Sequence, residues 1–218
     1  MAKQKRALTP AETARKERFD ALCREMAEAG YEKTDLTVGI VFANAASIFL
    51  MLPFAAALWV CYVLVNRSGR VDLSLGGALV FLVLLLLLTV VHEGIHGLTW
   101  GAFAKGHLRS ISFGVIWTYL TPYCTCAEPL KRWQYVVGTA MPTLILGFGL
   151  GAAAVGLGQP MLFLLSVIML FGGGGDALII LKVLFHRSGG RNAVYCDHPY
   201  ECGVVVFEQS SNIADKGA

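Results

Sequence analysis

The chain has 218 residues, of which 56% are hydrophobic and only 15% are charged, and its mean hydropathy is +0.60. This composition is too apolar for an ordinary soluble domain and favours a membrane protein. The formal net charge of +3 is small, and the basic residues form no stripe interleaved with aromatic residues. Nucleic-acid binding is therefore not expected.

Residues 1–37 form a polar segment of mixed charge ahead of the first apolar stretch. The segment has none of the features of a secretory signal. Thr9-Pro10-Ala11-Glu12 is a typical helix start, and apolar residues follow it at helical spacing amid charge: Phe19, Leu22, Cys23 and Met26. We predict a short amphipathic helix here, which lies on the membrane surface or is solvated in the cytosol.

Four stretches are long and apolar enough to cross about 30 Å of hydrocarbon as helices. They cover residues 38–65, 73–104, 135–157 and 161–185. Backbone groups in hydrocarbon must bond internally, so helix is the default there. The prediction is an all-α membrane protein with a four-helix core over residues 38–185 and a C-terminal tail over residues 186–218.

Two short segments outside these spans have the pattern of strands. Residues alternate with a period of about two from Ile111 to Tyr119, which predicts a cytoplasmic strand or hairpin. Gly203-Val204-Val205-Val206-Phe207 is a second candidate strand, and the turn-like Asp197-His198-Pro199 precedes it. The helical core is therefore expected to carry a small β element on its cytoplasmic side.

The distribution of positive charge predicts the orientation. Of the 18 lysines and arginines, only Arg67 and Arg70 follow the first span and none follows the third, so the other 16 lie on the opposite side. The positive-inside rule then predicts a multi-pass protein of the cell membrane with both termini in the cytoplasm. The six cysteines are scattered and would largely face a reducing compartment, so a disulfide framework is not expected.

The second span runs directly into His92-Glu93-Gly94-Ile95-His96. Residues four apart share one face of a helix, so both imidazoles can bind one metal ion, and Glu93 can act as general base on a water molecule. Ionisable groups are costly inside a membrane, which favours a catalytic zinc site with one ion. The alternative is that the helix has already reached the cytoplasmic interface. Gly94 and Gly97 would leave room beside the metal.

A catalytic zinc needs a third protein ligand, and Asp176 is the only carboxylate within the fourth span. At 1.5 Å per residue, His92 and Asp176 lie about 26 Å and about 23 Å along their spans, which predicts similar depths. The glycines at 172–175 would allow close helix packing or a local opening, and the alternative role for Asp176 is a bond to a neighbouring helix. Rival ligands are Glu128, His107, His186 and His198. A separate metal site could also use Cys124 and Cys126, with Cys196 and Cys202.

Four pieces of the sequence carry a resemblance to a known family. They are His92-Glu93-Gly94-Ile95-His96-Gly97-Leu98, Ala127-Glu128-Pro129-Leu130, Gly174-Gly175-Asp176, and Asp197-His198-Pro199 with Gly203 following. With them the chain resembles the putative zincin peptidases, small bacterial membrane proteins, and more distantly the site-2 proteases. The resemblance implies a four-helix membrane core, zinc bound by His92, His96 and Asp176, and Glu93 as general base.

One departure bears on the substrate. Site-2 proteases usually carry an asparagine and prolines ahead of Asp-Gly, whereas this chain has a glycine run and Asp176-Ala177. That difference argues against intramembrane cleavage of a helical substrate more than against zinc binding.

We expect a zinc-dependent membrane metallopeptidase that cuts a polypeptide or membrane-protein substrate at or within the cytoplasmic half of the membrane. The segment from Ile111 to Tyr119 could bind an extended substrate as an added strand. The alternatives are a non-catalytic zinc-binding scaffold or regulator, and a metal or proton transporter, for which four spans are few.

Overall fold

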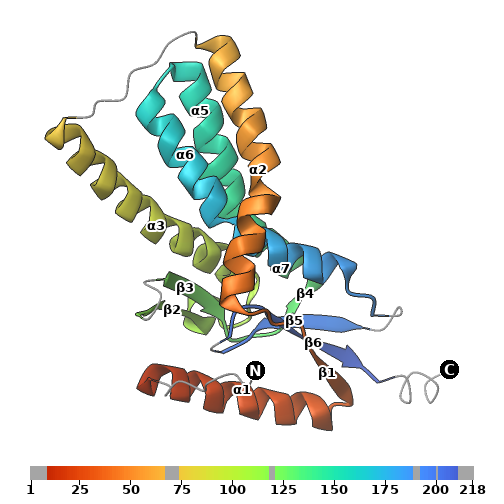
Figure 1. Cartoon of the computed structure of the whole chain (residues 1–218). Helices are drawn as coiled ribbons and strands as arrows, with labels where there is room; N and C mark the ends of the chain where they lie inside the picture. Colours follow the sequence, from red (N-terminus) through yellow and green to blue (C-terminus); the bar gives the residue numbers. More distant parts are fainter. Residues whose placement is uncertain (1–8, 67–73, 118–120, 189–191, 200, 211–218) are drawn as a thin grey trace.

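The computed structural model describes residues 9–66, 74–117, 121–188, 192–199 and 201–210. The fold is mostly helical with a small antiparallel sheet. The long helices lie at one end of the molecule, and helix α1 and the strands lie at the other (Figure 1).

Among the described residues, four helical segments are long and apolar enough to cross a membrane: Ile40–Val65, Leu75–Phe103, Arg132–Leu157 and Pro160–Phe185. The first two are single helices, α2 (Ile40–Val65) and α3 (Leu75–Phe103). The hydroxyl of Ser74 caps α3 by accepting the Gly77 N–H at 3.1 Å. Helices of the required length are thus present at all four predicted spans, with boundaries that differ by three residues at most.

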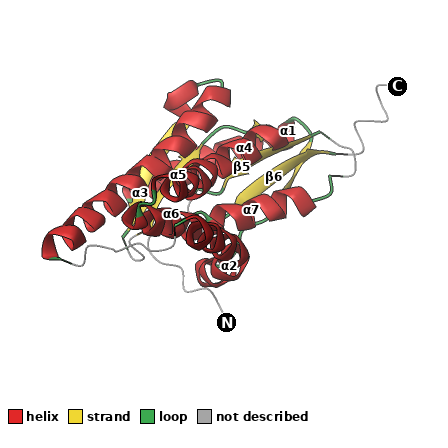
Figure 2. Cartoon of the chain, turned by 90° about the horizontal axis from the view of Figure 1, so that it is seen from above, coloured by secondary structure: helices red, strands yellow, loops and turns green. Residues whose placement is uncertain are grey.

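The third and fourth segments are both interrupted. The third consists of α4 (Arg132–Pro142), a π-helical turn η2 (Thr143–Gly149) and α5 (Leu150–Leu157). The fourth consists of α6 (Pro160–Gly172) and α7 (Gly174–Phe185), which meet at Gly173. Seen from the side and from above, α5 and α6 lie between α2 and α3 (Figures 1 and 2).

Two glycines at the break in the fourth segment allow close packing. A Cβ at Gly173 would overlap the Thr143 side chain in η2, and a Cβ at Gly174 would lie 2.6 Å from the Cβ of Ser47 in α2. Such contacts are too short for any residue but glycine, so α7 can begin in direct contact with both neighbours. A Cβ at Gly172 or Gly175 would meet nothing within 4 Å.

The sheet joins the two ends of the described chain. Its strands are β1 (Tyr31–Asp35), β4 (Leu130–Lys131), β5 (Ala193–Asp197) and β6 (Val204–Gln209), in the antiparallel order β1-β6-β5-β4. In the register, Thr34 and Tyr195 both lie opposite Val206. The candidate strand at residues 203–207 is confirmed as part of β6, but the prediction underestimated the β structure. The polar β1 was missed because it becomes a strand by pairing with a distant segment.

Helix α1 (Pro10–Glu28) packs on this sheet. The predicted helix start is confirmed and forms a capping box, in which the Glu12 N–H donates to the Thr9 hydroxyl and the Thr9 N–H donates to the Glu12 carboxylate. Phe19 and its helical neighbours contact the apolar side chains of β5 and β6, among them Phe207. The apolar side of α1 is thus buried against the sheet. The sequence analysis predicted a helix on the membrane surface or a solvated helix, and did not predict this packing.

A β-hairpin follows α3. After the short 3-10 helix η1 (His107–Ser110), strands β2 (Ile111–Ile116) and β3 (Thr121–Cys126) pair in antiparallel register. The predicted hairpin is confirmed, although Tyr119 at its predicted end lies outside the described residues. A Cβ at Gly97 of α3 would lie 2.5 Å from the Phe113 ring in β2. Gly97 therefore leaves room for the hairpin, and the prediction that it leaves room beside a metal was wrong.

Candidate metal centre

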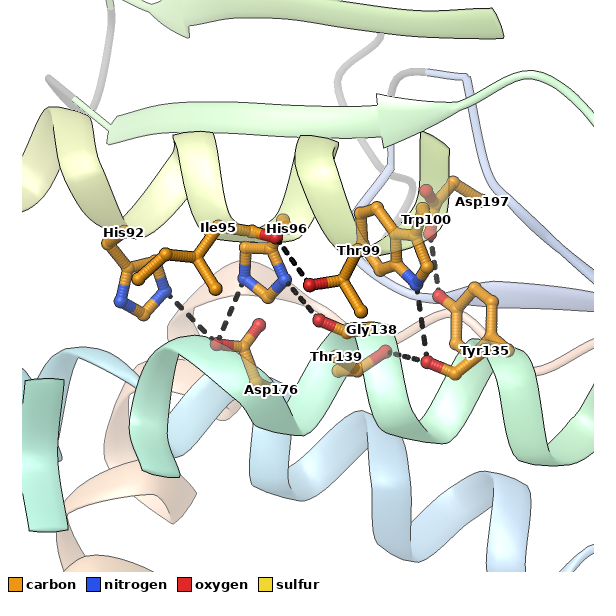
Figure 3. A network of polar contacts seen from close by, with 10 residues as sticks. All are labelled: His92, Ile95, His96, Thr99, Trp100, Tyr135, Gly138, Thr139, Asp176 and Asp197. Carbon is orange, nitrogen blue, oxygen red and sulfur yellow. Dashed lines mark hydrogen bonds and ion pairs between the residues drawn. The ribbon is translucent and has the colours of Figure 1, made fainter. Parts of the chain in front are cut away.

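Helix α3 places two histidines one turn apart on its packed side. His92 is 8% exposed and His96 is 3% exposed. Both imidazoles point away from the helix toward Asp176 (Figure 3). The predicted common face of His92 and His96 is therefore present in the folded chain.

Asp176 lies in the first turn of α7 and meets both histidines. Its Oδ2 atom is 3.2 Å from His92 Nε2 and 3.4 Å from His96 Nε2. One ligand atom from each of the three residues lies within 4.8 Å of the others. Two zinc–ligand bonds of about 2.0–2.1 Å at a tetrahedral angle separate their donor atoms by about 3.3 Å. The three side chains thus fit a single zinc ion, and the similar depths predicted for His92 and Asp176 are confirmed.

The second ring nitrogen of His96 fixes which atom faces the cluster. His96 Nδ1 lies 2.9 Å from the carbonyl oxygen of Gly138 in α4. A carbonyl only accepts, so Nδ1 carries a proton, and Nε2 is the nitrogen that faces Asp176 and can offer a lone pair to a metal ion. Histidines that bind metals commonly donate their other N–H in this way.

The helix break gives Asp176 a favourable position for a negative charge. A helix N-terminus carries a partial positive charge, and Asp176 is in the first turn of α7 because the fourth segment restarts at Gly174. An unbroken helix would offer no such compensation in an apolar setting. The glycine run therefore serves both close packing and the local electrostatics of Asp176.

Glu93 lies between this cluster and the hairpin. Its carboxylate is partly buried, interacts electrostatically with His92, His96 and Asp176, and is within hydrogen-bonding reach of the Cys124 backbone N–H in β3. The predicted general base is thus beside the three candidate ligands, and a backbone donor of the hairpin faces it.

Glu128, the principal rival ligand, is engaged elsewhere. Its carboxylate accepts the N–H of Lys105 at 2.7 Å, the N–H of Gly106 at 2.9 Å and the hydroxyl of Ser110 at 2.5 Å. Burial alone would raise the pKa of Glu128, but these hydrogen bonds hold it below its ordinary value. Glu128 stabilises the turn after α3 and is not part of the cluster.

The rival histidines also have other contacts. The His107 ring lies 3.3 Å from the carbonyl of Gly101, His186 pairs with Glu208 at 2.8 Å, and His198 accepts the N–H of Glu201 at 2.9 Å. None of the three rings joins His92 and His96 in a metal-binding group.

The cysteines do not form a second site among the described residues, where His92, His96 and Asp176 are the single group placed to hold an ion. All six cysteines are free thiols. Burial raises the pKa of Cys126 to about 12 and also raises those of Cys124 and Cys196. These thiols are therefore protonated at neutral pH in the structure as it stands.

A network behind His96 was not predicted from the sequence. It contains Trp100 of α3, Tyr135 of α4 and Asp197 at the end of β5 (Figure 3). Burial raises the pKa of Asp197 to about 6. Its carboxylate is therefore mostly ionised at neutral pH, and burying that charge costs desolvation energy. A tyrosine at the edge of a span and an aspartate two residues before a proline were visible in the sequence, but their pairing depends on the fold.

Two helix-borne histidines four residues apart, an adjacent glutamate and a third ligand from another helix form an arrangement typical of zinc metallopeptidases. Residues 85–189 match the family model described as "Putative zincin peptidase", in agreement with the predicted resemblance to that family. The matched segment contains Glu93 and all three candidate ligands, whereas Asp197 lies beyond its end. Comparisons with curated proteins and with solved structures gave no match.

Proposed function

We propose that the protein is a zinc-dependent membrane metallopeptidase that hydrolyses a peptide bond at or within the cytoplasmic half of the membrane. The observation that supports it best is the grouping of His92, His96 and Asp176 beside Glu93, in which both histidine Nε2 atoms lie at a zinc-like ligand separation from Asp176 Oδ2. The family match over residues 85–189 points to the same class of enzyme.

His92, His96 and Asp176 would hold one zinc ion, which supplies Lewis acidity that polarises the scissile carbonyl and lowers the pKa of a water molecule to about 7. Glu93 takes a proton from the attacking water as the oxygen bonds to the carbonyl carbon. It then delivers that proton to the amine nitrogen as the carbon–nitrogen bond breaks. Gly138 keeps His96 in the tautomer that this role requires.

The proposed setting is the cell membrane, with both termini in the cytoplasm and a polypeptide or a membrane protein as substrate. Four apolar helices and the uneven distribution of lysine and arginine support this orientation. The hairpin and the sheet lie at the same end of the helices (Figure 1), and Trp100 packs in one apolar core with Cys124 of β3 and Tyr195 of β5. We expect a substrate to reach the site from that side.

The test is metal analysis and hydrolysis of unstructured and membrane-inserted polypeptides by the purified protein in detergent. Wild type should carry about one zinc per chain. Glu93→Gln should keep the metal and lose about 100-fold or more in turnover, because only the proton acceptor is removed. His92→Ala should lose the metal as well as the activity.

The outcomes separate the proposed enzyme from the alternatives. A zinc-loaded protein whose cellular role survives Glu93→Gln but not His92→Ala is a non-catalytic scaffold or regulator. Zinc flux into liposomes that depends on His92 indicates a transporter. Absence of zinc from wild type, after purification without chelators and with zinc supplied, would refute the metal site itself.

A further inference from the structure

His96 is held in place by contacts on the side of its ring away from Asp176. Its Nδ1–H donates to the Gly138 carbonyl at 2.9 Å, and its ring stacks on the indole of Trp100 with centroids 4.9 Å apart and an interplanar angle of 16°. A Cβ at Gly138 would overlap that indole, so α4 must present bare backbone here. The orientation of His96 therefore depends on where α4 and Trp100 lie.

Tyr135 links the positions of α4 and Trp100. The Trp100 ring stacks on Tyr135 with centroids 5.7 Å apart, and its Nε1–H donates to the Tyr135 carbonyl at 3.3 Å. Tyr135 is 1% exposed and lies on α4 one turn before Gly138. A movement of α4 at Tyr135 would therefore displace Trp100, which stacks on His96. It would also displace the Gly138 carbonyl, which accepts the hydrogen bond from His96.

Asp197 anchors Tyr135 to the sheet and the hairpin. The Tyr135 hydroxyl donates to Asp197 Oδ1 at 2.6 Å, and the Cys126 N–H of β3 donates to Asp197 Oδ2 at 2.8 Å. One carboxylate at the end of β5 thus joins α4 to the hairpin strand whose Cys124 N–H faces Glu93. Asp197 therefore contacts both α4, which holds His96, and strand β3, which faces Glu93.

The chemistry of this junction favours a positioning role over a purely structural one. A buried carboxylate costs desolvation energy, and apolar side chains of the same size would hold two elements together at a lower cost. A carboxylate that accepts a short hydrogen bond on each oxygen instead fixes directions and distances. Such constraint matters where a histidine must keep one ring orientation.

We propose that Asp197 is a positioning residue for His96, acting through the Tyr135 hydroxyl, the Trp100 ring and the Gly138 carbonyl. The inference rests on the proposed zinc site, with His96 as a ligand. It adds that the geometry of the metal is set in part by a residue of the C-terminal sheet, outside the segment that matches the family model.

The experiment uses the full chain in detergent, stripped of metal and reloaded with Co²⁺, whose visible absorption reports ligand geometry. Zinc affinity is measured by competition with a chromogenic chelator. Asp197→Ala and Tyr135→Phe should each change the Co²⁺ bands and weaken zinc binding about tenfold, as removal of outer partners of metal ligands does. The double variant should be no worse than either single one, because both changes break the same link.

Two further variants keep the result specific. Asp197→Asn preserves the shape, and its amide can still accept one hydrogen bond, so it should recover most of the affinity lost in Asp197→Ala. Glu208→Gln is the matched control, because Glu208 is a 4% exposed carboxylate of β6 that pairs with His186 away from the cluster. It should leave the Co²⁺ spectrum and the zinc affinity unchanged even if it lowers the unfolding temperature.

The failures are distinguishable. A wild type that binds neither ion refutes the proposed zinc site and this inference with it. A wild type that binds both, together with Tyr135→Phe and Asp197→Ala that match it in spectrum and affinity, overturns the positioning role alone. If Asp197→Ala does not fold, Tyr135→Phe still decides the question, since it removes a single oxygen atom.

Discussion

At the scale of single residues, Glu128 has a role that can be separated from metal binding. It accepts three hydrogen bonds at the turn after α3, and its pKa in the folded protein is lowered by them. The stability it provides is therefore present above the unfolded pKa of about 4.3 and is lost as the pH falls through the lower folded pKa. Glu128→Gln should lower the free energy of unfolding at pH 7 by about 1–2 kcal/mol, because one acceptor oxygen is lost.

Thermal unfolding in detergent at pH 7 and at pH 4 measures this effect, since the difference between wild type and Glu128→Gln should shrink at the lower pH. Glu17→Gln, on the exposed side of α1, is the control and should be neutral. Zinc content should not change in either variant. Loss of zinc from Glu128→Gln would restore Glu128 as a ligand and displace Asp176 from that role.

The sequence predicts those parts of the candidate centre in which metal-binding residue types occur at helical spacing. The i, i+4 spacing gives His92 and His96, and depth along the spans gives Asp176, because helical rise is nearly constant. Gly138 and Trp100 were not predictable, since a backbone carbonyl carries no residue signature and an aromatic residue in a span is usually packing. Their role follows only from the approach of α4 to α3.

At the scale of elements, the prediction that a substrate binds as an added strand can be tested at the outer edge of β2. The described part of the chain pairs β2 with β3 alone. Val115 lies opposite Pro122, which has no N–H, so we infer that this pair is not bonded across the hairpin and that the Val115 N–H points outward. Val115→Pro should therefore spare the hairpin while removing a donor to an added strand.

The expected result is a loss of about tenfold in turnover of an extended polypeptide with unchanged zinc content, consistent with one lost hydrogen bond and a steric block. Val115→Ala is the matched control and should stay near wild type, because it keeps the N–H. Equal turnover of Val115→Pro and wild type would dispose of strand addition at this edge.

The elements themselves were predictable to different degrees. Long apolar stretches have few alternatives to helix in hydrocarbon, so all four spans were found with close boundaries. The break at Gly173 depends on the approach of Thr143 and Ser47 from other helices, which no local pattern reveals. Strand β1 is mostly polar and pairs with residues 170 to 178 positions away, so its sequence alone does not predict it.

At the scale of the whole molecule, the sheet constrains how the chain is inserted in a membrane. β1 precedes the first span and β6 follows the fourth, yet they pair from Tyr31–Gln209 to Asp35–Val205. An even number of crossings is the arrangement that brings these two strands to the same side. Four spans satisfy this condition, and the excess of lysine and arginine on that side then predicts that it is cytoplasmic.

Cysteine accessibility in intact cells tests the orientation. Gln159, in the turn between α5 and α6, and Glu17, on α1, are both exposed, so Gln159→Cys and Glu17→Cys should leave the fold intact. A membrane-impermeant maleimide should label Gln159→Cys in intact cells, and Glu17→Cys only after the membrane is permeabilised, with wild type giving the background of the native thiols. The reverse pattern would place the sheet outside the cell and Glu93 in the outer half of the membrane, because the site lies toward the sheet end of α3. Labelling of both positions before permeabilisation would mean that the long helices do not separate them across a bilayer, and the membrane orientation would have to be abandoned.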